Sequence, residues 1–287
     1  DTNMNVIKGA SIKTYLLEKT RITRLNADER NFHFFYQLLN CGDTTLLTSL
    51  YLVNDVMCYK YLNCSNEVTL TTINDKEQFQ RTMQCFHTLN FTQDEINTVL
   101  KLVAAVLLIG NITFTSHNDN NIQISSNCDN VVSNVCELLS CDENEFKRTL
   151  TTKVRVSANS TTETPLTVDN ANTFRDSFAK ELYIRLFKWI VTKMNNKLNT
   201  YNSDNSVDNS DNVKYIGLLD IFGFECYKMN SLEQLCINYT NEQLHQLYIK
   251  DYFEEEVNEF KREGLNDQVS LLSYTNNQSI IELIDKY

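Results

Sequence analysis

The stretch Tyr215-Ile-Gly-Leu-Leu-Asp-Ile-Phe-Gly-Phe-Glu225 decides how this chain is interpreted, because an apolar run leads directly into an acid, a glycine and a second acid. The apolar run predicts a buried strand that ends at Asp220. At the carboxyl end of a strand in a phosphate-binding α/β fold, an acid can hold the water shell of Mg²⁺. A glycine there lets a backbone N–H approach a phosphate. Asp220 and Gly223 are therefore candidate nucleotide-site residues, although about one D-x-x-G match is expected by chance in a chain this long.

Composition limits the classes of function that fit this chain. Its 287 residues are 42% hydrophobic and 22% charged, which is typical of a globular protein in the cytosol. The longest apolar run, residues 102–109, is far shorter than the roughly 20 residues that span a bilayer. A net charge of −11 argues against a nucleic-acid partner. The nine cysteines form no C-x-x-C pair and the four histidines lie far apart, so no metal-ligand cluster is predicted.

Hydrophobic periodicity predicts a mainly helical chain. We expect a strand at residues 6–17 and helices at 28–39, 75–89, 92–110, 131–139 and 142–150. Alternation at residues 152–156 and 165–168, around a polar tip at 157–164, predicts a projecting hairpin. Apolar residues spaced four apart predict a long helix over 171–198, and the Asn-rich residues 202–212 predict a surface loop. A last helix of about 30 residues is expected to begin with Asn230 as N-cap and Glu233 at N3.

Four ordered blocks of sequence resemble the myosin motor family. The stretch Asp220–Glu225 resembles the switch II loop of that family, and Asn230-Ser-Leu-Glu-Gln-Leu-Cys-Ile-Asn-Tyr-Thr-Asn241 resembles the start of its relay helix. The other blocks are residues 9–21 with Glu29-Arg-Asn-Phe-His-Phe-Phe-Tyr-Gln-Leu-Leu39, Ala104-Ala-Val-Leu-Leu-Ile-Gly-Asn-Ile-Thr-Phe114, and Arg175-Asp-Ser-Phe-Ala-Lys-Glu-Leu-Tyr-Ile-Arg-Leu-Phe-Lys-Trp-Ile-Val191. A kinesin-like switch protein shares the D-x-x-G-x-E pattern, but the blocks at 9–39 and 175–191 favour myosin.

The resemblance implies roles for five residues. Asp220 would hold Mg²⁺ through water, the Gly223 N–H would bond the γ-phosphate of ATP, and Glu225 would pair with an arginine on another loop. Phe224 and Asn241 would connect this loop to the relay helix. A bond present in one nucleotide state and absent in another can bias a two-state loop, and a long helix can transmit that bias.

The predicted hairpin resembles the surface loop of the upper actin-binding subdomain of myosins. Lys153 and Arg155 are basic residues that could contact an actin filament. The family often has an acidic or phosphorylatable residue sixteen positions before the block matched by Asp176-Ser-Phe-Ala-Lys180, and that count ends on Ser160. A hydroxyl without a regulatory role is the alternative interpretation, since Thr161 and Thr162 are adjacent.

No G-x-x-x-x-G-K-[ST] motif occurs, and the six glycines do not supply a phosphate-binding loop. The chain is therefore expected to be an internal part of a motor that uses ATP and Mg²⁺, binds actin and takes calmodulin-like light chains elsewhere. Alone it is expected neither to bind nor to hydrolyse ATP, and to be poorly soluble. The alternative is a non-catalytic remnant that binds actin or another partner.

The fold class expected is α/β and mostly helical, a partial P-loop NTPase-type motor with a few strands of a central sheet. We expect residues 1–200 to resemble the upper actin-binding subdomain, 201–212 to form the Asn-rich loop, and 213–287 to contain switch II, relay helix and relay loop. A cytoskeletal location in the cytoplasm follows from the same resemblance. After Gly264 the sequence departs from the relay-loop pattern of many myosins.

Overall fold

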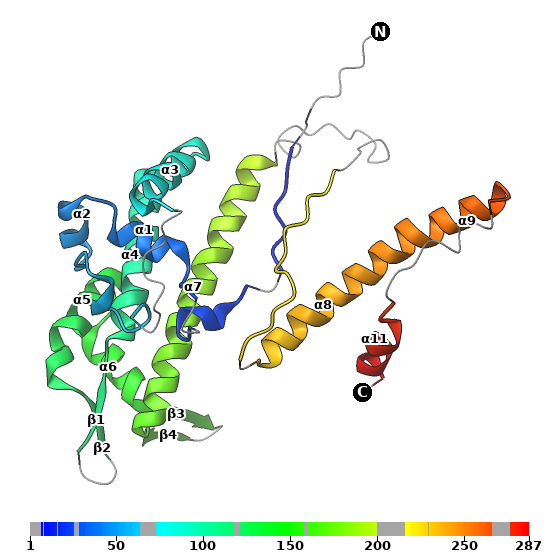
Figure 1. The fold of residues 1–287 in the computed structure, drawn as a ribbon. Helices are drawn as coiled ribbons and strands as arrows, with labels where there is room; N and C mark the ends of the chain where they lie inside the picture. Colours follow the sequence, from blue (N-terminus) through cyan, green and yellow to red (C-terminus); the bar gives the residue numbers. More distant parts are fainter. Residues whose placement is uncertain are drawn as a thin grey trace. The chain divides into compact units, whose positions relative to one another are not determined.

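The computed structural model describes residues 7, 9–15, 17–25, 29–63, 73–117, 121–157, 160–199, 216–228, 230–265 and 276–286. The chain divides into two compact units, Asp1–Ser206 and Val207–Tyr287. Figure 1 shows the helices and strands of each unit. The predicted Asn-rich loop at 202–212 lies outside the described residues.

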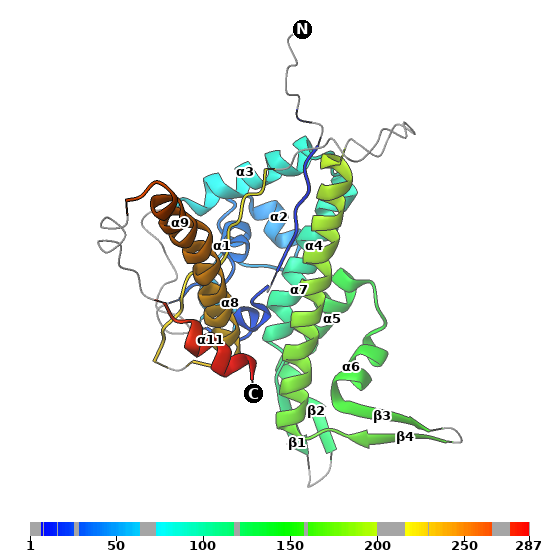
Figure 2. The same cartoon turned by 90° about the vertical axis from the view of Figure 1, so that its right-hand side faces the viewer.

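Helix α4 (Gln93–Gly110) is the centre of the first unit, with eleven of its residues buried. It begins with the predicted capping box, in which the Thr92 N–H donates to Glu95 Oε2 (2.8 Å) and the Glu95 N–H donates to Thr92 Oγ1 (3.3 Å). Helix α4 packs against α7 (Val168–Leu198) and α5 (Asp129–Leu139), and Figure 2 shows α7 running along it. Within the predicted α7 stripe Leu186 is buried and Phe178, Leu182, Ile190 and Met194 pack partly buried against the core, whereas Phe174 is exposed.

Shorter helices complete this unit. Helices α1 (His33–Leu39), α2 (Thr44–Ser49), α3 (Asp75–Thr88) and α6 (Glu143–Thr151) are joined by the 3₁₀ turns η1 (Lys19–Ile22), η2 (Val56–Cys58) and η3 (Ser126–Cys128). Asp43, Asn74 and Asp142 each accept a hydrogen bond from a first-turn N–H, which satisfies part of the helix start. The helices predicted at 28–39, 75–89, 92–110, 131–139 and 142–150 are confirmed; the first begins later, at His33.

The described strands form two antiparallel hairpins. Strand β1 (Phe114–His117) pairs with β2 (Asn121–Ile124), and β3 (Thr152–Ser157) pairs with β4 (Ser160–Pro165). The second hairpin confirms the predicted hairpin, but its returning strand is residues 160–165 and not 165–168: most of the expected polar tip is part of β4, and Val168 begins α7. Thr and Ser extend readily into a strand when a partner strand is in register.

Two predicted strands are absent from the part of the chain that the structure describes. Within residues 6–17 the described positions have no strand partner; Ile12 N–H instead donates to Asn195 Oδ1 (2.7 Å), and Asn195 Nδ2 returns a bond to Ile12 O (2.9 Å). Residues 216–220 are likewise unpaired and exposed, with Leu218 95% exposed. An apolar run becomes a strand only when neighbouring backbone pairs with it, and no described segment does so. The expected strands of a central sheet are therefore not found among the described residues.

The second unit contains one long helical segment. It consists of α8 (Leu232–Ile249), the π-helical turn η6 (Lys250–Glu254) and α9 (Glu255–Arg262), and it is followed by α11 (Gln278–Asp285). The predicted helix of about 30 residues is confirmed. No helix in the described ranges is long and apolar enough to cross a membrane.

Candidate functional site

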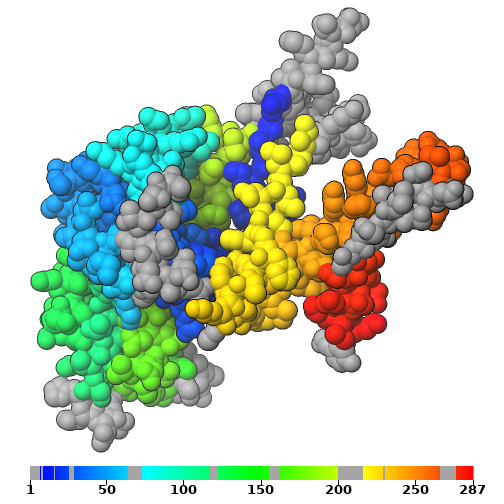
Figure 3. All heavy atoms as spheres, viewed as in Figure 1, coloured from blue at the N-terminus to red at the C-terminus, as the bar shows by residue number. Residues whose placement is uncertain are grey.

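The loop that precedes α8 is exposed along most of its length. Asp220 is exposed, and so is Gly223, where an added Cβ would meet no atom within 4 Å. Figure 3 shows this segment in yellow with its side chains at the surface. The Asp220 carboxylate is thus accessible to the waters of a metal ion, and the backbone at Gly223 is open to a phosphate oxygen. Both residues therefore fit a bound nucleotide with Mg²⁺.

Glu225 is the point at which this loop is fastened to α8. Its backbone N–H donates to Asn238 Oδ1 at 2.7 Å, and its carbonyl accepts from Asn238 Nδ2 at 2.7 Å. One side-chain amide therefore satisfies both backbone groups of a single loop residue. We call this pair of hydrogen bonds the Asn238 clamp.

A second contact joins the Glu225 side chain to the start of α8. Gln234 Nε2 donates to Glu225 Oε2 at 3.4 Å, and Gln234 Oε1 accepts from the Ser231 N–H (2.8 Å) and hydroxyl (2.6 Å). Gln234 is buried, with 8% of its surface exposed. The carboxylate therefore lies beside the first turn of a helix, where the free N–H groups favour negative charge.

The N-terminus of α8 begins one residue later than the sequence predicted. Ser231 is the N-cap and Gln234 is its N3 partner, whereas Asn230 instead closes the preceding turn by bonding Tyr227 N–H and O at 3.0 and 2.9 Å. The predicted N-cap at Asn230 and N3 at Glu233 are wrong. An Asn followed by a Ser offers two possible caps, and here the Asn is used by a local turn.

Phe224 and Asn241 are the residues expected to link the loop to the helix, and that role stays a prediction. The Asn241 amide donates to Ile237 O within its own helix (2.9 Å), and Phe224 is 67% exposed. The sequence analysis missed Asn238 and Gln234, two helix side chains that contact the loop at Glu225. A signal for Asn238 was present, because Asn238 lies three positions before Asn241 and so shares its helical face.

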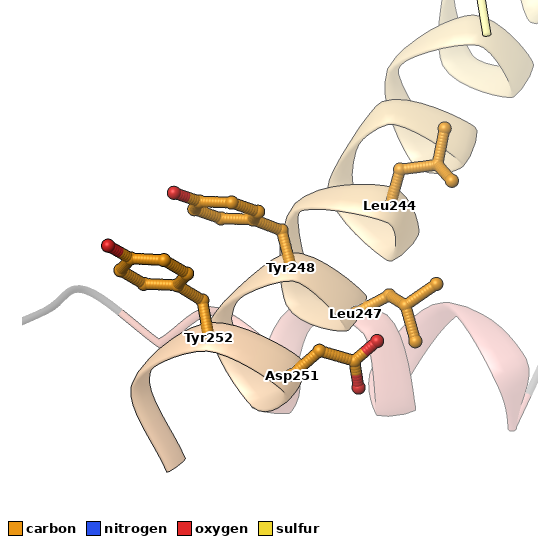
Figure 4. Close-up of a pocket in the computed structure, with 5 residues that line it drawn as sticks. All are labelled: Leu244, Leu247, Tyr248, Asp251 and Tyr252. Carbon is orange, nitrogen blue, oxygen red and sulfur yellow. The ribbon is translucent and has the colours of Figure 1, made fainter. Parts of the chain in front are cut away.

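Beyond the clamp, the helix carries an aromatic cluster across the π turn. Tyr248 and Tyr252 stack at 5.5 Å between ring centroids with 9° between their planes. Figure 4 shows both rings projecting together from one helix, beside a shallow hollow lined by Leu244, Leu247, Tyr248, Asp251 and Tyr252. The hollow brings no pair of catalytic groups together.

Helix α11 is tied to α8 by polar contacts. The Tyr239 hydroxyl bonds Asp285, which raises the pKa of Tyr239, and Asn277 Nδ2 donates to Glu242 Oε1 at 2.8 Å. The helix that holds Glu225 through its first turns thus also contacts a later segment of the chain.

The β3–β4 hairpin presents the predicted basic residue Lys153 to solvent. Its base is joined to α6 by an ion pair between Arg148 and Glu163. Ser160 starts β4 and pairs with Ser157 at the hairpin end, and Arg155 pairs with Thr162. The side chains of Arg155 and Ser160 lie outside the described part of the structure, so their expected roles stay predictions.

No group of three or more His, Cys, Asp or Glu side chains with metal-binding geometry occurs among the described residues.

Comparison with known proteins gives a consistent result. A profile of the family described as Myosin head (motor domain) matches residues 2–287. The chain is 36% identical over 278 residues to unconventional myosin-Ic-A of Xenopus laevis, covering 97% of this chain and 26% of that protein. It is 36% identical to unconventional myosin-Id of Homo sapiens, covering 97% and 27%, and 37% identical to unconventional myosin-Id of Rattus norvegicus with the same coverage. The chain thus spans about a quarter of the length of these relatives.

Proposed function

Because this chain belongs to the myosin motor-domain family, we propose that it forms part of an actin-based cytoskeletal motor that hydrolyses ATP. In this proposal residues 213–287 sense the nucleotide and residues 1–200 form the part that faces actin. Light chains and the phosphate-binding loop belong to other parts of the protein. The main structural support for the proposal is the pair of hydrogen bonds that joins the Glu225 backbone to Asn238 of α8.

The chemistry at the loop follows from its exposed groups. Bound ATP with Mg²⁺ supplies the phosphoryl group that is transferred to water. Asp220 would hold the metal through its water shell, and the Gly223 N–H would donate to the γ-phosphate, where negative charge develops. Glu225 would position the loop through a charged partner.

The Asn238 clamp converts a change in this loop into a force on a helix. Both bonds are to the backbone of Glu225, so any movement of that backbone must either carry α8 with it or break the bonds. The helix is 18 residues long before the π turn, so a shift at its first turns reaches about 27 Å along the chain. Two discrete positions of the loop would therefore correspond to two positions of α8.

The test measures ATP hydrolysis by the complete protein that contains these residues, with and without actin filaments. We expect hydrolysis that needs Mg²⁺ and is stimulated by actin. Asp220→Asn should lower kcat by about a hundredfold or more, because it weakens a contact to the reacting phosphate's metal. Asp251→Asn, an acid on the same helical segment but away from the loop, is the matched control and should leave kcat unchanged.

Two results would overturn the proposal. One is a complete protein that binds actin filaments equally with and without ATP and hydrolyses none, which is the behaviour of a non-catalytic binding module. The other is equal loss of activity in the Asp220→Asn and Asp251→Asn variants. Titration of the 287-residue chain alone with Mg·ATP is expected to show no binding, and micromolar binding would contradict that separate expectation.

A further inference from the structure

Two cysteines meet at the corner between α5 and α6. Cys136 is buried in the last turn of α5, and Cys141 is exposed just after that helix ends. The Cys141 thiol neighbours that of Cys136 and helps to raise its pKa. Neither belongs to the loop or to the hairpin described above, so the motor proposal assigns them no role.

The backbone at this corner holds the two residues at a fixed separation. Ser140 is left-handed (φ 53°, ψ 46°), the Cys141 N–H donates to Cys136 O at 3.0 Å, and the Ser140 N–H donates to Glu137 O at 3.2 Å. These are the two bonds of a Schellman motif, in which the side chains at the positions of Cys136 and Cys141 normally contact each other. In most proteins that contact is between apolar side chains, and here it is between two thiols.

The separation suits a disulfide. A 3.0 Å bond between the Cys141 nitrogen and the Cys136 oxygen limits the distance between their Cα atoms to less than about 7 Å, because each atom is one or two covalent bonds from its Cα. Disulfides form when Cα atoms are about 4.4–6.8 Å apart. The six-residue loop from 136 to 141 therefore closes with little movement of the backbone.

The two thiols differ in their access to an oxidant, and Cys141 is the more accessible one. Burial and the neighbouring Cys141 thiol raise the pKa of Cys136 to about 12, so Cys136 stays protonated and unreactive on its own. Cys141 is exposed and can meet an oxidant directly. An accessible cysteine next to a second, resolving cysteine is an arrangement that supports reversible thiol oxidation.

We propose that Cys136 and Cys141 form a redox modification site, which a hydroperoxide converts to a reversible intramolecular disulfide. The Cys141 thiolate attacks one peroxide oxygen, an S–O bond forms, the O–O bond breaks, and the leaving hydroxide takes a proton to become water. The Cys136 sulfur then displaces the hydroxyl group of the Cys141 sulfenic acid; an S–S bond forms, the S–O bond breaks, and the Cys136 proton leaves with the hydroxyl as a second water. Two thiols are oxidised and one peroxide is reduced.

The disulfide would fix the end of α5 to the start of the segment that leads into α6. Helix α6 runs directly into β3 and is joined to β4 by the Arg148–Glu163 pair. Oxidation therefore affects the helices that support the β3–β4 hairpin and modifies no residue of the hairpin itself.

The experiment exposes the folded protein containing this chain to hydrogen peroxide, blocks free thiols with N-ethylmaleimide, and maps cysteines by mass spectrometry. We expect a peptide carrying both Cys136 and Cys141 that is lighter by two hydrogen atoms, unlabelled, and returned to two free thiols by dithiothreitol. In Cys141→Ser, which replaces an exposed residue, Cys136 should remain a reduced thiol. In Cys85→Ser, a matched exposed cysteine on α3, the internal disulfide should form as before.

The proposal is overturned if Cys141 accumulates as sulfinic acid while Cys136 stays reduced in the folded protein. It is also overturned if Cys136 is oxidised equally in the Cys141→Ser variant, or if either cysteine pairs preferentially with a distant one. A circular-dichroism spectrum of each variant that matches the parent protein ensures that the result reports on the folded corner.

Discussion

Removal of the Asn238 side chain should release the switch-like loop from α8 without unfolding the helix. In Asn238→Ala both 2.7 Å hydrogen bonds to the Glu225 backbone are lost. Each such bond contributes about 1 kcal/mol net, so local opening at Glu225 becomes easier by about 2 kcal/mol. Alanine is the best helix former, and the helix itself gains rather than loses stability from the change.

Amide hydrogen exchange measures this opening directly. A change of about 2 kcal/mol corresponds to a roughly thirtyfold faster exchange of the Glu225 amide, because every 1.4 kcal/mol is a factor of ten. Asn238→Asp keeps an acceptor for the Glu225 N–H but removes the donor to its carbonyl, so it should give an intermediate rate. Amides in the middle of α8 should be unaffected in both variants.

Asn241→Ala is the matched control, since that side chain donates only to Ile237 O in its own helix. Its Glu225 amide should exchange within about twofold of the parent rate. The reasoning is refuted if Asn238→Ala leaves the Glu225 exchange rate unchanged, or if Asn241→Ala accelerates it equally. The second outcome would show that Asn241, the residue that the resemblance indicates, is also coupled to the loop.

Three further predictions concern the first unit. Arg175→Met removes a guanidinium that is 1% exposed and bonds both the Ile112 carbonyl just after α4 (2.7 Å) and the Asp176 carboxylate (2.7 Å). It should cost about 1–3 kcal/mol in urea unfolding, because the Ile112 carbonyl loses its donor, whereas Asp176 keeps the hydrogen bond from the Tyr61 hydroxyl. Gly110→Ala places a Cβ 2.8 Å from the ring of Tyr61 and should lower thermal stability by about 1–3 kcal/mol. Hydrogen bonds from Lys193 and from the Thr92 backbone lower the pKa of Glu95 from its ordinary value. The ionised Glu95 carboxylate therefore stabilises the folded protein above the unfolded-state pKa, and this contribution is lost as the pH falls through the lower folded-state pKa. Glu95→Gln should flatten that part of the curve of urea midpoint against pH.

Each of these predictions has a control within the chain. Arg185→Met, on the same helix but 77% exposed at its side chain, should change stability by less than about 1 kcal/mol. Gly217→Ala meets no atom within 4 Å and should be neutral. Glu77→Gln, in the first turn of α3, is the matched substitution for Glu95→Gln. Equal effects of variant and control in any pair would contradict the explanation for that pair.

Features that depend on neighbours in the sequence were predictable. Thr92 and Glu95 are three positions apart, and their capping box needs nothing beyond the turn that contains them. The stripe of apolar residues four apart placed α7 correctly, and the structure extends it to Val168 because Thr167 caps that end. Helix caps and apolar stripes of this kind are determined by residues that are close together in the sequence.

Features that depend on distant partners were not predictable. The apolar residues before Asp220 suggested a buried strand, yet pairing requires a neighbouring segment that the local sequence does not specify. Likewise, Asn238 and Asn241 share one helical face, and which of them meets Glu225 depends on the path of the loop. That path follows from the cap at Ser231, one residue beyond the predicted position.

The π turn at Lys250–Glu254 has a geometric consequence for anything that binds along α8 and α9. A π turn accommodates one residue more than the regular spiral, which rotates every later side chain by about 100° around the axis. The two segments are therefore out of phase, and a single stripe drawn along Leu232 to Arg262 changes sides halfway. Deleting one residue from the turn would bring them into phase and re-aim the acidic run Glu254–Glu256, so a partner that recognised both segments would lose one of them.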